Sequence, residues 1–149
     1  MIQGKWFAPG EDLSPLLPLR QSVFHQGADA LDPLSWNVLV YEDETPAATG
    51  RIWWEEGAFR IGALCVLPER RGRRLGDLTL RLLLFKAQSH AAREVRLRSP
   101  ADTAGFFSRL GFRPDPEAGD AEEMWLPGDE IELDSCKSCR KANCPNRQA

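Results

Sequence analysis

Residues 64–86 read LCVLPERRGRRLGDLTLRLLLFK, and the fold of the chain is inferred outward from this stretch. The apolar run Ile61 to Leu67 is long enough for a buried strand, and Pro68 ends it because proline lacks a donor for the sheet. From Leu75 onward, apolar residues recur at helical spacing. The stretch therefore predicts a strand, a basic turn over residues 68–76 and a long helix.

This turn has the properties of an anion site. Free backbone N–H groups converge at a helix N-terminus, the helix dipole favours negative charge, and glycine lets a phosphate approach closely. The alternative is a loop whose arginines are only solvated. We favour the anion site because the arginines cluster at the turn and not along the helix: Arg70, Arg71, Arg73 and Arg74.

The turn resembles the acetyl-CoA signature of the GNAT N-acetyltransferase family, V-x-P-x-x-R-G-x-G-x-G. The matching residues are Val66, Pro68, Arg71, Gly72 and Gly76, while Arg74 stands where a glycine is usual. The resemblance implies that backbone amides of residues 72–77 hold the CoA pyrophosphate and that the preceding strand pairs with the pantetheine. The cofactor-binding residues expected on this basis are Leu64, Cys65, Val66, Arg71, Gly72, Arg73, Arg74, Leu75, Gly76 and Asp77.

Composition predicts a soluble protein with one main domain. The chain has 149 residues, of which 42% are hydrophobic and 28% charged. Its net charge of −3 argues against general nucleic-acid binding. Neither a membrane span nor the apolar core of a signal peptide is found, so we expect a cytoplasmic location. In that compartment the four cysteines are thiols or metal ligands, not disulfides.

The expected element order also resembles that of a GNAT domain. Strands are expected at 2–7, 36–41, 45–55, 58–67, 94–98, 112–114 and 122–126, and helices near 16–24, 75–86 and 101–110. The strand before the central helix and the strand after it should pair in parallel. The predicted fold is α/β (α+β), a GNAT fold with a mixed, strongly twisted sheet of about six to seven strands flanked by helices.

Local features of the strands refine this picture. Gly50 is a candidate β-bulge, and the adjacent Trp53 and Trp54 should face opposite sides of their strand. Two further segments resemble family motifs: FFSRLGF at 106–112, and RQSVFHQG at 20–27 with the aspartates that follow it, Asp29 and Asp32. We expect a GNAT acyl-CoA-binding domain at residues 1–128 and a cysteine-containing tail at 129–149.

The resemblance leaves the catalytic groups unassigned. It implies that a backbone amide near residues 64–66 polarises the thioester carbonyl. The family's usual tyrosine acid is replaced by Phe107, its glutamate base by Arg60, and a subgroup glutamine by Pro100. Phenylalanine cannot donate a proton. Local candidates for replacement, each with a plainer structural role as the alternative, are Tyr41, Glu55, Glu56 and Cys65.

The tail carries a second candidate site. Cys136 and Cys139 have C-x₂-C spacing and Cys144 follows, which suits zinc if a fourth ligand comes from elsewhere. Candidates for that ligand are Cys65, His25, His90 or a partner chain. Neighbouring cations would also lower thiol pKa values and favour redox chemistry. A tail with free thiols is an equal alternative.

Three functional hypotheses follow. The first is an N-acetyltransferase that moves the acetyl group of acetyl-CoA to a primary amine of a small molecule or peptide by direct attack. The second is a non-catalytic acyl-CoA-binding or sensing module. The third is a metal- or redox-responsive interaction protein that acts through the tail. The expected partners are acetyl-CoA and an amine acceptor, with a homodimer as a further candidate and no membrane.

Overall fold

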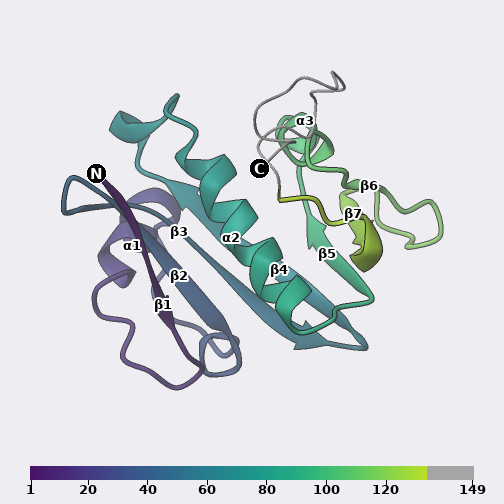
Figure 1. Ribbon diagram of the computed structural model, residues 1–149, viewed down its shortest axis with the longest axis horizontal. Coiled ribbons are helices and arrows are strands. Elements are labelled where there is room, and N and C mark those ends of the chain that lie inside the picture. The colour runs from purple at the N-terminus through teal and green to yellow at the C-terminus, as the bar shows by residue number, and fades with distance from the viewer. Residues whose placement is uncertain (134–149) are drawn as a thin grey trace, which may run out of the picture.

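One mixed sheet forms the body of the protein in the computed structural model, which describes residues 1–133 (Figure 1). The sheet has seven strands in the order β1-β2-β3-β4-β5-β7-β6. Their bounds are β1 Ile2–Phe7, β2 Trp36–Glu42, β3 Thr45–Glu55, β4 Ala58–Val66, β5 Glu94–Arg98, β6 Arg113–Pro114 and β7 Glu123–Pro127. Every neighbouring pair is antiparallel except β4 and β5, so the predicted mixed sheet is confirmed.

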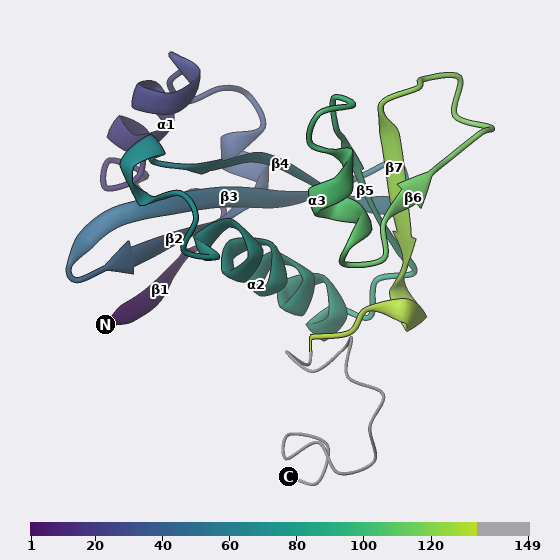
Figure 2. The same cartoon turned by 90° about the horizontal axis from the view of Figure 1, so that it is seen from above.

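Helices cover both faces of the sheet, as Figure 2 shows. Helix α2, Leu75–Ser89, buries Leu80, Leu83 and Leu84 against one face, in a cluster with Val38 and Ile52. Helix α1, Leu17–Phe24, covers the opposite face, where its Leu19 packs in another cluster with Leu39. Val38 and Leu39 are neighbours on β2, so strand alternation alone sends them to the two faces. The strand pattern thus builds a core on each side.

An ion network ties α1 to the sheet beneath it. Arg20 of α1 donates to Asp32 at 2.8 Å and to Asn37 of β2 at 3.0 Å. Arg51 of β3 donates to Asp29 at 2.7 Å and to Asp32 at 3.0 Å. Burial is the largest single effect on the pKa of Asp32 and would raise it, but the hydrogen bonds from Arg20, Asp29 N and Arg51, together with the charge of Arg20, outweigh burial and lower the pKa. The two aspartates noted after the RQSVFHQG segment therefore hold two arginines, one from α1 and one from the sheet.

Strands β4 and β5 pair over only a short length and then separate (Figure 1). The paired positions are Phe59 with Val95 and Arg60 with Arg96. Strand β4 continues for six more residues, 61–66, without a partner on that side. The sheet is therefore split between its two central parallel strands, and one edge of β4 is free to bind an extended ligand.

A β-bulge was expected at Gly50 in β3, but the structure places the extra residue in β4, opposite Gly50. Thr49 of β3 pairs with Cys65 and Arg51 with Gly62, so one residue of β3 faces two residues of β4. The extra residue lies in β4, where Ala63 has a φ of 50°. Gly50 is needed for space, because a Cβ there would lie 2.9 Å from a Leu83 side-chain carbon. The bulge therefore interrupts the β3–β4 pairing within the part of β4, residues 61–66, whose other edge is free.

Other expectations differ in extent. The helix expected at 101–110 is shortened to α3, Ala104–Ser108, and Gly111 follows with a φ of 100°. Trp53 is 8% exposed and Trp54 57%, which confirms that they face opposite sides. Packing continues beyond residue 128 to Ile131, which is 6% exposed, whereas the domain boundary itself stays a prediction. Within residues 1–133, helices are too short or too polar to cross a bilayer.

Candidate active site

The basic turn leads directly into the N-terminus of α2. Arg74 precedes the helix with a φ of 63°, and Gly72 has a φ of 83°. The left-handed φ at residue 74 explains why the family signature favours glycine there, since a side chain adopts it at some cost. The first backbone bond into the helix runs from Leu78 N to the Arg74 carbonyl at 3.0 Å. The amides of residues 75–77 thus open the helix without an intrahelical acceptor.

Glu42 organises two of the four arginines of this turn. Its Oε1 atom accepts from Arg70 and from Arg73, each at 2.7 Å, which lowers the pKa of Glu42. Arg71 instead donates from Nε to the Val66 carbonyl at 3.2 Å and closes the turn back onto β4. Arg74 is exposed, and no ion pair to it is found within residues 1–133. The cluster is therefore partly neutralised and held in shape.

Three elements meet where the split in the sheet opens toward this turn. A Cβ placed on Gly76 of α2 would lie 3.4 Å from Val66 of β4 and 3.5 Å from the ring of Phe106 of α3. Glycine at 76 thus leaves room for close packing of strand, helix and aromatic ring. The turn, the unpaired part of β4 and α3 therefore lie next to one another, and the expected cofactor-binding residues belong to this turn and to β4.

The weak catalytic candidates fall in three places: Phe107 in α3, Tyr41 and Cys65 in the cluster under α1, and Glu55 and Glu56 at the β3–β4 connection. Phe107 of α3 packs edge-on against Phe106, with ring centroids 5.0 Å apart, and against Phe112. Tyr41, at the end of β2, packs on the α1 face. Cys65 is 5% exposed in the same cluster, and burial raises the pKa of its thiol to about 11. A buried, protonated thiol is a poor nucleophile, so the packing role of Cys65 is favoured.

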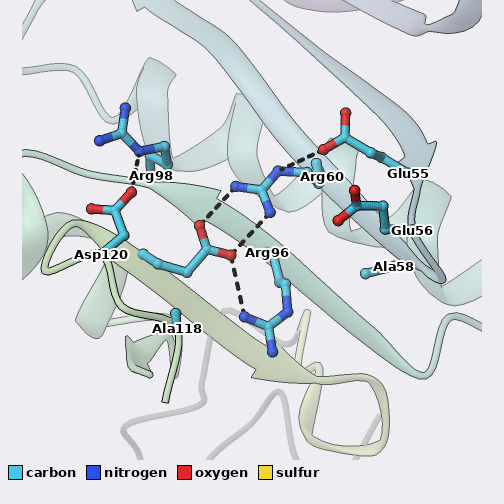
Figure 3. A pocket seen from close by; sticks show the side chains of 9 residues that line it. Glu55, Glu56, Ala58, Arg60, Arg96, Arg98, Ala118 and Asp120 are labelled. Carbon is cyan, nitrogen blue, oxygen red and sulfur yellow. Dashed lines mark hydrogen bonds and ion pairs between the residues drawn. The ribbon is translucent and has the colours of Figure 1, made fainter. Parts of the chain in front are cut away.

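Glu55 and Glu56 line a pocket of about 550 Å³ on the sheet face that carries α1 (Figure 3). Glu55 ends β3 and Glu56 begins the β3–β4 turn, and both are exposed. Arg60, Arg96 and Arg98 project into the same pocket from β4 and β5. Arg60 and Arg96 are also the last residues that pair before the sheet splits. The pocket therefore adjoins the closed end of the split.

Arg60 replaces the glutamate base that the family resemblance implies, but a carboxylate from β7, that of Glu123, lies beside it. Glu123 accepts two hydrogen bonds from Arg60, at 2.8 and 2.9 Å, and one from Arg96 at 3.2 Å. These cations, Arg60 first, hold the pKa of Glu123 below its usual value. A carboxylate so stabilised is a weak proton acceptor. Sequence patterns could not reveal Glu123, because it lies 63 residues from its partner.

The metal hypothesis gains no support within residues 1–133. No group of three or more histidine, cysteine or acidic residues there is arranged to hold a metal ion. Cys136, Cys139 and Cys144 lie outside the described residues. Of the proposed fourth ligands, Cys65 is buried, His25 follows α1, and His90 contacts the rings of Trp36 and Phe59.

Comparison with known proteins agrees with this arrangement. The family model described as an acetyltransferase (GNAT) domain matches residues 35–114. The uncharacterized N-acetyltransferase YjcF of Bacillus subtilis strain 168 is 24% identical over 111 residues, which cover 69% of this chain and 79% of that protein. Escherichia coli ElaA superposes with a TM-score of 0.72 at 23% identity, over 84% of this chain and 99% of that one.

A GNAT family acetyltransferase from Brucella melitensis, solved in complex with acetyl-CoA, is also similar. Its TM-score is 0.67 at 20% identity, over 85% of this chain and 88% of that chain. These matches define the class as acyl-CoA N-acyltransferases. Since the family model spans more than half of the sequence, the chain belongs to the GNAT acetyltransferase family.

Proposed function

We propose that this chain transfers the acetyl group of acetyl-CoA directly to a primary amine of a small molecule or peptide. The observation that carries the proposal is the split between β4 and β5, with the basic turn and the N-terminus of α2 following directly after β4. Membership of the GNAT family and the acetyl-CoA complex of the similar Brucella melitensis protein support the same cosubstrate.

The residues around the split have separate tasks in this proposal. Amides of residues 72–77 bind the pyrophosphate, assisted by the helix dipole and arginine charge. The pantetheine lies along the free edge of β4, which runs from Ile61 to Val66. Six residues of strand span about 20 Å, a length suited to an extended arm. The thioester would then lie near the bulge at Ala63 and Leu64, where a backbone amide polarises its carbonyl.

Direct attack requires no covalent enzyme intermediate. The neutral amine forms a C–N bond with the acetyl carbon, the C–S bond breaks, the amine gives a proton to solvent, and the departing CoA thiolate takes one up. The acid and base are unassigned. Phe107 cannot donate the proton, and Arg60 and Glu123 neutralise one another. Holding the two reactants together supplies the main catalytic effect, which is worth several kcal/mol.

A thiol-release assay tests the proposal. Purified full-length protein is incubated with acetyl-CoA and a panel of amines, polyamines, amino acids and peptides, and mass spectrometry identifies the acetylated product. Release of CoA that depends on one class of amine supports transfer. Binding of acetyl-CoA by calorimetry without turnover of any amine would favour the sensing hypothesis. Absence of binding would refute both.

A cytoplasmic location, a homodimer and a role for the cysteine tail stay predictions.

A further inference from the structure

The pocket on the α1 face opens on the side of the sheet opposite α2. Helix α2 lies on one side of the sheet, while Arg60 and Arg96 face the other, because their neighbours Ile61 and Val95 pack beneath α2. A thioester held in the split would thus be reached from the pocket side. The pocket is therefore the entry for the acceptor amine, an inference that rests on the proposed function.

The arginines of this pocket have little capacity left for an anionic ligand. Arg60 is bound bidentately by Glu123, with Glu55 at 3.9 Å. Arg96 forms ion pairs with three carboxylates, those of Glu94, Asp115 and Glu123. Arg98 forms ion pairs with two, those of Asp120 and Glu122. A carboxylate or phosphate ligand would therefore have to displace an internal ion pair.

Two carboxylates that line the pocket, those of Glu55 and Glu56, have fewer or longer contacts with other side chains. Glu55 has the 3.9 Å contact with Arg60 and accepts a long hydrogen bond of 3.3 Å from Trp53 Nε1. Glu56 is exposed, and among residues 1–133 no hydrogen bond or ion pair to its side chain is found. The lining carries four carboxylates against three guanidinium groups. Its uncompensated charge is therefore negative and is concentrated on the β3–β4 turn (Figure 3).

We propose that this pocket selects an acceptor with a second cationic group, such as a diamine or polyamine. The neutral amine at one end extends from the pocket into the split and attacks the thioester near Ala63 and Leu64. The ammonium at the other end binds the carboxylates of Glu55 and Glu56. A cavity of about 550 Å³ has room for an aliphatic chain between the two ends. Acceptors that carry a carboxylate at the far end are disfavoured, because that end would meet Glu55 and Glu56.

Three acceptors of similar length test the proposal: 1,5-diaminopentane, 5-amino-1-pentanol and 6-aminohexanoate. We expect kcat/KM to fall in that order, with the diamine at least about fivefold above the amino alcohol at low salt. Glu56→Gln and the double variant Glu55→Gln/Glu56→Gln should lower the ratio of kcat/KM for the diamine to that for the amino alcohol toward one. The control, Glu44→Gln, removes an exposed carboxylate from the β2–β3 turn at the other end of the sheet and should preserve the ratio.

Other outcomes separate this proposal from the proposed function. Equal rates for the three amines, or a ratio unaffected by the double variant, would overturn the selection while leaving acetyl transfer intact. Turnover of an unrelated amine, with none of the three acetylated, would have the same consequence. If calorimetry finds no binding of acetyl-CoA to the wild-type protein, the proposed function itself fails.

Discussion

Arg60 and Glu123 form a bidentate ion pair that crosses from β4 to β7 over the intervening strand β5. Because Arg96 binds the same carboxylate, Glu123 joins two guanidinium groups that would otherwise repel each other. These arginines occupy the last paired position before the sheet splits. The pair therefore fixes the width of the split at its closed end.

The first prediction concerns this carboxylate. Glu123→Gln should cost about 1–3 kcal/mol in unfolding free energy, because two largely buried cations lose their shared acceptor. It should also weaken binding of acetyl-CoA, since the split is no longer fixed. Denaturant titration and calorimetry measure the two effects. The control is Glu122→Gln, which removes a half-exposed partner of Arg98. Equal effects of both variants would contradict the special role of Glu123.

The second prediction concerns the anion turn. Gly76→Val should weaken binding of acetyl-CoA by about tenfold or more, because its branches have no room between Val66 and Phe106. Gly76→Ala should be milder, since its Cβ makes only contacts of 3.4 Å or longer. Calorimetry gives both constants. Gly105→Val, in α3, is the control, because nothing lies within 4 Å of its added Cβ. Identical binding by the valine variants would refute this account.

The third prediction concerns the ion network under α1. Asp32→Asn should cost about 3–5 kcal/mol, since Arg20 and Arg51 are buried and depend on that carboxylate. Asp102→Asn, at an exposed aspartate, should change stability by less than about 0.5 kcal/mol. Urea midpoints at pH 7 compare the two. A near-neutral Asp32→Asn would show that the buried pair contributes little.

The same network makes stability depend on pH. The pKa of Asp32 is lowered on folding, so the unfolded chain takes up its proton first as pH falls. Its contribution is complete above the ordinary carboxyl pKa near 4 and is lost as pH falls through the lower folded value. Asp29, whose pKa the Arg51 hydrogen bond lowers, adds in the same direction. Between pH 5 and pH 2 the wild type should therefore lose more stability than Asp32→Asn. Parallel losses would contradict this assignment.

The fold could be predicted from sequence where local signals were strong. Pro68, the glycine turn and the apolar spacing from Leu75 mark strand, turn and helix within one continuous stretch. The bulge was assigned to the wrong strand because glycine at 50 serves packing against Leu83, which no local pattern reports. Helix α3 is shorter than its motif suggests, since its first turn is irregular.

Only the part of the site that is contiguous in sequence could be predicted. The anion turn is contiguous in sequence, so its residues were identified together. The pocket is not contiguous: Glu55, Arg96 and Glu123 come from three elements that meet through strand pairing. Glu42 likewise reaches Arg70 and Arg73 from the end of β2, 28 and 31 residues away. Charges spaced so far apart resemble ordinary surface residues until the sheet order is known.

The last prediction concerns the missing acid. Phe107 occupies the position where the resemblance implies a tyrosine proton donor, so the CoA thiolate leaves unassisted or takes its proton from water or another side chain. A thiolate is a tolerable leaving group, since its conjugate thiol has a pKa in the range of cysteine. Transfer should therefore be slow but measurable. Phe107→Tyr should accelerate it by up to about a hundredfold, the range of general-acid catalysis, provided that the hydroxyl reaches the sulfur.

Two further measurements identify the cause of that acceleration. The gain should vanish as pH rises through about 10, where tyrosine loses its proton. Phe106→Tyr adds a hydroxyl to the neighbouring ring, which lies against Gly76, and should give no such pH-dependent gain. A wild-type rate that Phe107→Tyr leaves unchanged would place the acid on another side chain or on water. If both proteins bind acetyl-CoA and neither acetylates any amine, the chain acts as an acyl-CoA sensor and the catalytic hypothesis is wrong.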